Sequence, residues 1–256
     1  MNVDIDNHGD SYKLSAAVLV YTNQHRHHAI ATKHMVEVDN DSPRIRPGSP
    51  FSVADYKVLT RALAPHEQRM VWQDPRLLAS GQGRMLWWTP PQKRPLFFQK
   101  SKYNADTFDG KGVCPCPGLV WMAETGQQAA LYVYAVSGKE KPSKATSLFQ
   151  APFFNVWSRG KVCVGNAALP QEDARSDPDA WERMFFGSRF THPNFTEADR
   201  LTKGVKPTEF WRGQLARPSK AFPERVLVSL DLTVGDLCEI DFDNKLGEIP
   251  RAQGEF

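Results

Sequence analysis

The residues with the clearest chemical potential lie in FFNVWSRGKVCVGN, residues 153–166, where an aromatic pair leads through a basic turn to one cysteine. A nucleophilic cysteine needs thiolate character, access to substrate, and donors for the oxyanion that forms on an attacked carbonyl. Gly160 and Gly165 flank Cys163, so backbone amides can approach closely. Asn155, eight positions earlier, carries an amide that could reach an oxyanion if the loop folds back. The segment predicts a nucleophilic site, with a buried strand cysteine as the simpler alternative.

The other candidate site residues also have structural explanations. Asn155 could stabilise the turn by hydrogen-bonding within its own loop. His192, in RFTHPN, could serve as a base for an incoming amine or as a cationic partner that favours the Cys163 thiolate. A purely structural histidine is an equally good interpretation, so both readings of each residue stay open at this point.

The remaining histidines and cysteines do not predict a metal or redox site. Four histidines cluster between residues 25 and 34, but no cysteine or carboxylate completes a ligand set. Cys114-Pro115-Cys116 is one residue short of a redox Cys-x-x-Cys motif and has no second pair for zinc. Four cysteines in 256 residues are too few for a disulfide framework. We therefore expect free thiols, no metal and no cofactor.

Composition indicates an ordinary globular protein. The formal charge is +3, and lysine and arginine are scattered along the chain without a single basic block, so direct nucleic-acid binding is not expected. No segment approaches the roughly 18 to 20 uninterrupted apolar residues of a membrane span. The start, MNVDIDNHGDSYK, is too polar for a secretory signal. We expect a cytoplasmic protein with no membrane partner.

The first hundred residues predict a small α+β unit. Segments 16–24 and 27–38 have the β-branched, alternating composition of a hairpin. Residues 51–63 offer Ser52 as an N-cap and place apolar residues at three- and four-residue steps, which indicates an amphipathic helix. Two strand-like runs then surround a Pro-Pro turn. The stretch that ends in GVCPCPG is expected to be irregular, which places the domain boundary there and the N-terminal unit at residues 1–105.

The second part, residues 106–256, predicts an antiparallel meander with flanking helices, so the fold class is α+β. GLVWMAE (118–124) and ALYVYAV (130–136) read as strands, and a proline-containing crossing leads from them to the cysteine segment. A helix is expected after Ser176 or Asp177, with Pro178 in its first turn. One further strand is expected within residues 225–234.

These residues carry a resemblance to a known family. APFFNVWSRGKVCVGN resembles the active-site segment of ubiquitin-conjugating enzymes, in which His-Pro-Asn leads through a turn to Gly-x-x-Cys at the same spacing as Asn155 to Cys163. Phe153 and Phe154 stand where the eukaryotic enzymes have histidine and proline, and aromatic packing could build the loop here. The whole chain, including LWWTPP, VCVGNAALP and WERMFFGSRFTH, is similar to the bacterial family called PRTRC system protein B, also classed as prokaryotic family D of ubiquitin-conjugating-like proteins.

The resemblance implies a ubiquitin-conjugating-like domain at residues 106–256 behind the N-terminal unit. It implies that Cys163 accepts a ubiquitin-like protein as a thioester from a ThiF-like activating enzyme and passes it to an amine, with Asn155 as an oxyanion or positioning amide. A JAB-type metallopeptidase is a further expected partner. The activating enzyme would consume the ATP, so the resemblance also implies no cofactor for this chain.

Two functions of other classes compete with this interpretation. A catalytically silent scaffold could keep the fold and bind a ubiquitin-like protein, and it predicts no covalent adduct at Cys163. A hydrolase could use Cys163 with His192. Cysteines of papain-type hydrolases usually lie at a helix N-terminus, whereas Cys163 follows strand-like residues.

Overall fold

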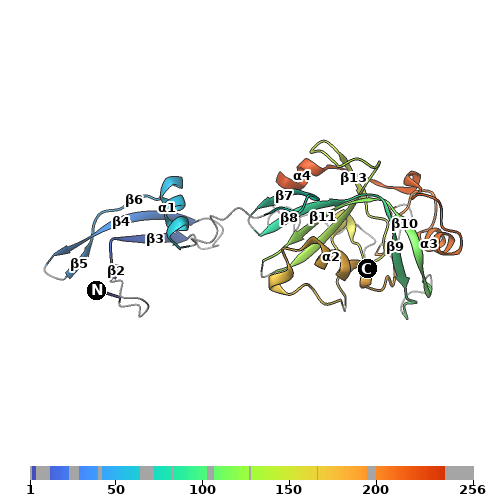
Figure 1. The fold of residues 1–256 in the computed structure, drawn as a ribbon, viewed down its shortest axis with the longest axis horizontal. Helices are drawn as coiled ribbons and strands as arrows, with labels where there is room; N and C mark the ends of the chain where they lie inside the picture. Colours follow the sequence, from blue (N-terminus) through green and yellow to red (C-terminus); the bar gives the residue numbers. More distant parts are fainter. Residues whose placement is uncertain are drawn as a thin grey trace. The chain divides into compact units, whose positions relative to one another are not determined.

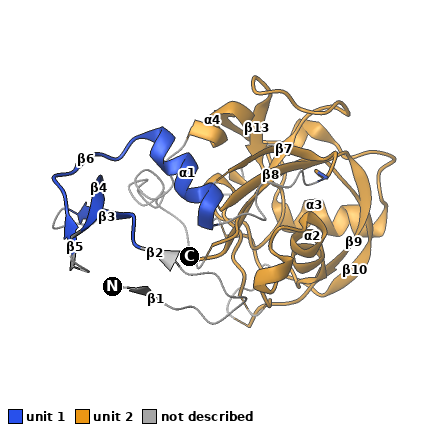
Figure 2. Cartoon of the chain, turned by 60° about the vertical axis from the view of Figure 1, so that its left-hand side comes forward, with its two compact units in different colours: residues 1–72 blue, residues 73–256 orange. Residues whose placement is uncertain are grey.

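The computed structural model divides the chain into two compact units, Met1–Trp72 and Gln73–Phe256 (Figure 2). Each unit has its own strands, and α1 lies in the first unit whereas α2, α3 and α4 lie in the second, as Figure 1 shows. The structure describes residues 2–3, 12–22, 29–39, 42–63, 72–81, 83–102, 107–126, 128–165, 167–194 and 200–239.

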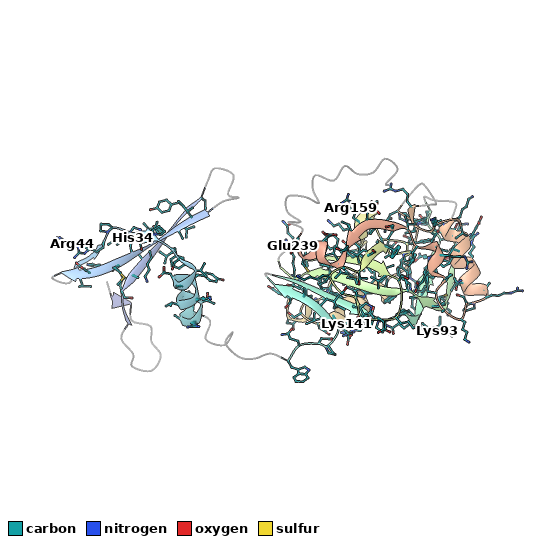
Figure 3. The ribbon with its side chains drawn as sticks, turned by 90° about the horizontal axis from the view of Figure 1, so that it is seen from above. His34, Arg44, Lys93, Lys141, Arg159 and Glu239 are labelled. Carbon is teal, nitrogen blue, oxygen red and sulfur yellow. The ribbon has the colours of Figure 1, made fainter. Side chains whose placement is uncertain are left out.

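The described residues of the first unit form a small antiparallel sheet and one helix. β3 (Ala16–Thr22) pairs with β4 (Ala29–Asp39), which confirms the predicted hairpin, and β5 (Ser42–Ile45) and β6 (Ser49–Pro50) pair with other parts of β4. Two short strands, β1 (Asn2–Val3) and β2 (Tyr12–Lys13), pair with each other. Figure 3 shows the side chains of this unit, with His34 and Arg44 labelled on its strands.

The predicted helix of this unit is α1 (Val53–Leu63), and it begins where its cap residue predicts. The Ser52 hydroxyl accepts a hydrogen bond from the Asp55 N–H at 3.1 Å, and the Asp55 carboxylate accepts one from the Ser52 N–H at 3.0 Å. This reciprocal pairing satisfies two amides at the helix start. No residue of α1 is buried, so its apolar stripe, with Leu63 75% exposed, does not contribute to a core.

The second unit is built on a six-stranded antiparallel sheet in the order β14-β13-β12-β11-β8-β7. Its central strands β11 (Gly118–Glu124) and β12 (Ala130–Val136) form the predicted meander. The other four strands are β7 (Leu77–Gly81), β8 (Arg84–Thr89), β13 (Ser147–Gln150) and β14 (Ser229–Thr233). The protein is therefore of the predicted α+β class.

A separate hairpin and three helices complete the part of this unit that the structure describes. The hairpin joins β9 (Gln92–Phe98) to β10 (Gly110–Cys116). The helices are α2 (Pro178–Gly187), α3 (Pro207–Ala216) and α4 (Val234–Glu239). Short 3-10 turns lie at Ser158–Gly160, Glu172–Ala174 and Glu224–Val226. None of the helices in the described residues is long and apolar enough to span a membrane.

The structure differs from the sequence prediction at the internal boundary. The chain divides into its compact units between Trp72 and Gln73, not near residue 105, because β7 and β8 pair into the sheet of the second unit. The stretch expected to be irregular forms β10, in which Pro115 lies opposite Lys93. Proline is compatible with a strand that has a free edge, since its missing N–H can face away from the partner strand.

Both faces of the main sheet are buried at its centre. On β11 the side chains alternate between the two faces, so that Leu119 and Trp121 join one apolar cluster while Val120 and Met122 join another. The first cluster includes Trp181 of α2 and Trp211 of α3, whereas the second includes Val234 and Leu237 of α4. Burial on both faces explains why GLVWMAE is an unbroken apolar run.

Candidate functional site

Cys163 lies at the end of a short hairpin that starts at Asn155. The Cys163 N–H donates to the Asn155 carbonyl at 2.7 Å, and the Trp157 N–H donates to the Lys161 carbonyl at 2.7 Å. These bonds place Asn155 and Cys163 opposite each other across the hairpin. The spacing of eight residues is therefore the spacing of a cross-strand pair.

The hairpin turn depends on backbone conformations with positive φ. Arg159 has φ +59° and Gly160 has φ +89°. A Cβ atom at Gly160 would lie 2.7 Å from the Tyr134 ring and 2.8 Å from the Val133 carbonyl oxygen. Glycine is thus required here both by the backbone and by the close approach of β12.

The aromatic pair before Asn155 anchors the hairpin in the core. Phe153 and Phe154 are each only 1% exposed. The Phe153 ring stacks on Trp211 at 5.5 Å between centroids, and the Phe154 ring meets Phe98 edge-on at 5.4 Å. Such packing contributes energy beyond area burial alone. Aromatic contacts therefore fix the start of the loop, as the sequence had indicated.

The Asn155 side chain ties the hairpin to the segment that follows α2. Its Nδ2 donates to the Arg189 carbonyl at 2.8 Å, and its Oδ1 accepts from both the N–H and the hydroxyl of Thr191, each at 3.3 Å. The residue adopts φ +64°, a conformation that asparagine tolerates better than most residues. The amide thus bridges two segments and is not confined to its own loop.

His192 is half-buried beside this bridge. Its Nδ1 lies 2.9 Å from the Thr191 hydroxyl oxygen. Burial lowers the pKa of His192 below its ordinary value of 6.5, because the charged form loses hydration. The neutral form dominates at neutral pH, which suits a base better than a cationic partner for the cysteine.

One pocket brings together the three site residues predicted from the sequence. Its volume is about 610 Å³, and Cys163, Asn155 and His192 all line it. The other lining residues come from the position after β9, the loop after the cysteine, α2 and the segment after α2: Gln99, Val164, Gly165, Ala167, Ala168, Arg183, Met184, Gly187, Ser188, Arg189 and Thr191. Of these, Gly165 was identified from the sequence as a glycine beside Cys163, whereas Gln99 and the residues of α2 had no sequence signal that pointed to a site.

A buried ion-pair group holds the helix that forms one wall of this pocket. Glu182 of α2 is 4% exposed, and its carboxylate accepts hydrogen bonds from Arg76, from Arg94 and, at 3.1 Å, from the Trp87 indole. These partners belong to β8, β9 and the segment before β7. The group fixes α2 against the strands and so positions Arg183 and Gly187 at the pocket.

Cys114, Cys116 and His34 are not among the described residues that line this pocket. Burial raises the pKa of the Cys114 and Cys116 thiols, so they resist ionisation. His34 uses both ring nitrogens locally, on Thr32 and on the Arg46 carbonyl. His25, His27 and His28 lie outside the described residues. Within the residues that are described, no three His, Cys, Asp or Glu side chains are grouped as metal ligands would be.

The position of Cys163 also bears on the hydrolase alternative. The residue follows the hairpin bridge at Lys161 and Val162, and the next α-helix starts at Pro178. Cys163 thus lies outside any helix N-terminus, the location in which a helix dipole would favour a thiolate. The pocket offers a thiol, a neutral imidazole and an amide, which can support acyl transfer to and from a sulfur atom.

Comparison with known proteins gives one match. The model of Prokaryotic E2 family D matches residues 55–230, which include all of α1 but its first two residues, the whole hairpin and the pocket. Neither the curated proteins nor the solved structures contain a match to this chain. The match covers more than half of the chain and contains every residue of the candidate site. The chain therefore belongs to prokaryotic E2 family D.

Proposed function

We propose that this chain carries a ubiquitin-like protein as a thioester on Cys163 and transfers it to an amine. One observation carries the proposal: in a member of an E2 family, Cys163 and His192 line the same pocket while Asn155 faces the cysteine across a hairpin. This arrangement supplies a nucleophile, a base and a positioning amide.

Two acyl transfers make up the proposed reaction. In the first, the Cys163 thiolate attacks the thioester carbonyl that joins the ubiquitin-like protein to its activating enzyme, and the thiolate of that enzyme leaves. In the second, the acceptor nitrogen attacks the new thioester, its C–S bond breaks and the Cys163 thiolate leaves. The proton lost by the amine passes to His192, which is neutral before the step.

In this proposal, the two N–H groups of the Asn155 amide have different functions. One Nδ2 hydrogen binds the Arg189 carbonyl, which orients the amide. An asparagine amide carries a second N–H, which can donate to an oxyanion that forms on the attacked carbonyl. We also propose the partners that the family resemblance implied, namely a ThiF-like activating enzyme and a JAB-type metallopeptidase, and with them the assignment to the PRTRC system.

The test combines the chain with a ubiquitin-like protein, a ThiF-like enzyme and Mg-ATP, followed by a non-reducing gel. The expected result is an adduct that thiols release, that is lost in Cys163→Ala, and that resists thiols in Cys163→Ser because an oxyester forms. Cys238→Ala is the matched control, since Cys238 is an exposed thiol outside the pocket. Absence of an adduct, with an activating enzyme shown to be charged, would instead favour a binding scaffold.

A further inference from the structure

We infer that Thr191 is a positioning residue that sets the tautomer of His192. Its hydroxyl donates to Asn155 and accepts from the Nδ1–H of His192, so that Nε2 is left as the unprotonated ring nitrogen. The structural part of this inference stands alone, and its role in amine transfer rests on the proposed function.

The orientation of the Asn155 amide follows from its backbone partners. The Arg189 carbonyl can only accept, so the atom 2.8 Å from it must be Nδ2. The Thr191 N–H can only donate, so the atom 3.3 Å from it must be Oδ1. Both partners require the same orientation.

The direction of the next bond follows from the number of hydrogens available. Asn155 Oδ1 accepts only, and the Thr191 hydroxyl lies 3.3 Å from it with a single hydrogen to donate. For both contacts of the hydroxyl to be hydrogen bonds, that hydrogen must point to Oδ1, and the hydroxyl must accept from His192 Nδ1 at 2.9 Å. Nδ1 must then carry the proton of the neutral ring, because neutral imidazole has one protonated nitrogen.

The hydrogen bonds from Asn155 through Thr191 to His192 determine which ring nitrogen can accept a proton. With Nδ1 protonated, the basic lone pair of the neutral ring is on Nε2, the ring nitrogen that takes no part in these hydrogen bonds. When an amine attacks the thioester, its proton can move to Nε2 while the Nδ1–H bond to Thr191 holds the ring in place. The opposite tautomer would offer N–H at Nε2 and could not accept that proton.

The direct test is ¹⁵N NMR of histidine-labelled protein at about pH 8, where the ring is neutral. The His192 signals are identified by their loss in His192→Gln. We expect the Nδ1–H tautomer in the wild type and in Thr191→Ser, which keeps the hydroxyl. Thr191→Val, which has nearly the same shape without the hydroxyl, is expected to shift the population toward Nε2–H. An Nε2–H wild type, or an unchanged tautomer in Thr191→Val, would overturn the inference.

A second measurement separates this inference from the proposed function. Discharge of pre-formed thioester to an amine is followed in a single turnover, with unfolding curves of each variant as a check on folding. Thr191→Val should discharge about 10-fold to 100-fold more slowly, part of the roughly 10²–10⁴-fold that a positioned general base contributes. Thr191→Ser should restore the rate.

The outcomes are distinguishable. If no thioester forms from a charged activating enzyme, the proposed function fails, while the NMR result still decides the tautomer. If the thioester forms and the tautomer shifts but Thr191→Val discharges at the wild-type rate, the role of Thr191 in amine transfer is refuted and the proposed function stands.

Discussion

Replacing Gly160 with alanine tests the reasoning about the hairpin turn. Gly160 has φ +89°, and an added Cβ would lie 2.7 Å from the Tyr134 ring and 2.8 Å from the Val133 carbonyl. The left-handed backbone alone costs an L residue roughly 1–2 kcal/mol. The contact adds an overpacking cost of about 1–3 kcal/mol, because the carbonyl belongs to a central strand and cannot move freely. The free energy of unfolding should therefore fall by roughly 2–5 kcal/mol.

Gly138→Ala is a matched control for this change. Gly138 has φ +86°, but a Cβ there would meet no atom within 4 Å, so only the backbone cost applies. Unfolding is followed by tryptophan fluorescence in denaturant, since buried tryptophans report the core of the second unit. Gly160→Ala should lose at least about 1 kcal/mol more than Gly138→Ala. Equal losses in the two variants would refute the argument from close approach.

Three further predictions concern the surroundings of the pocket. Glu182→Ala should lower the unfolding free energy by about 3–5 kcal/mol, because it leaves two guanidinium groups without their buried carboxylate. Calorimetry should show that the control Arg183→Ala, at the exposed neighbouring position, loses under about 1 kcal/mol. An equally small loss in Glu182→Ala would contradict the role of Glu182 in holding α2 against the strands. Since burial lowers the pKa of His192, the unfolded chain binds more protons than the folded one as pH falls through about 6.5 to the lowered pKa, so the free energy of unfolding drops over that range. Denaturant curves should show a smaller drop in His192→Gln, and equal drops would contradict a buried neutral ring. Alkylation with mass mapping at about pH 8 should modify Cys163 in the folded protein and the two buried thiols of β10 only after unfolding. Alkylation of the β10 thiols in the folded protein would contradict their burial in the core.

Elements with a strong local pattern could be predicted from the sequence. The hairpin of β3 and β4, the capped helix α1 and the strands β11 and β12 all follow from alternation, capping residues or apolar runs. Asp177 also caps α2 as predicted, by accepting from the Asp179 N–H at 2.9 Å. In each case the decisive interactions join residues close in sequence.

Features that depend on distant partners could not be predicted in the same way. Proline in GVCPCPG suggested a break, but pairing with β9 makes it a strand. Because β7 and β8 pair with the meander, the observed boundary between units follows residue 72, whereas the predicted boundary was residue 105. The bridge from Asn155 to Thr191 spans more than thirty residues of sequence, and no local motif encodes it. Cys163, Asn155 and His192 were found by residue type, whereas the pocket that unites them required the fold.

The most direct test of the central claim is to find the atom that carries the ubiquitin-like protein. The adduct formed with a charged activating enzyme is digested at low pH, which preserves thioesters, and its peptides are mapped by mass spectrometry. The account predicts that the C-terminus of the ubiquitin-like protein is joined to the Cys163 sulfur and is released by hydroxylamine. An adduct on Cys238 or on a lysine, or no adduct from an activating enzyme that charges normally, would contradict it.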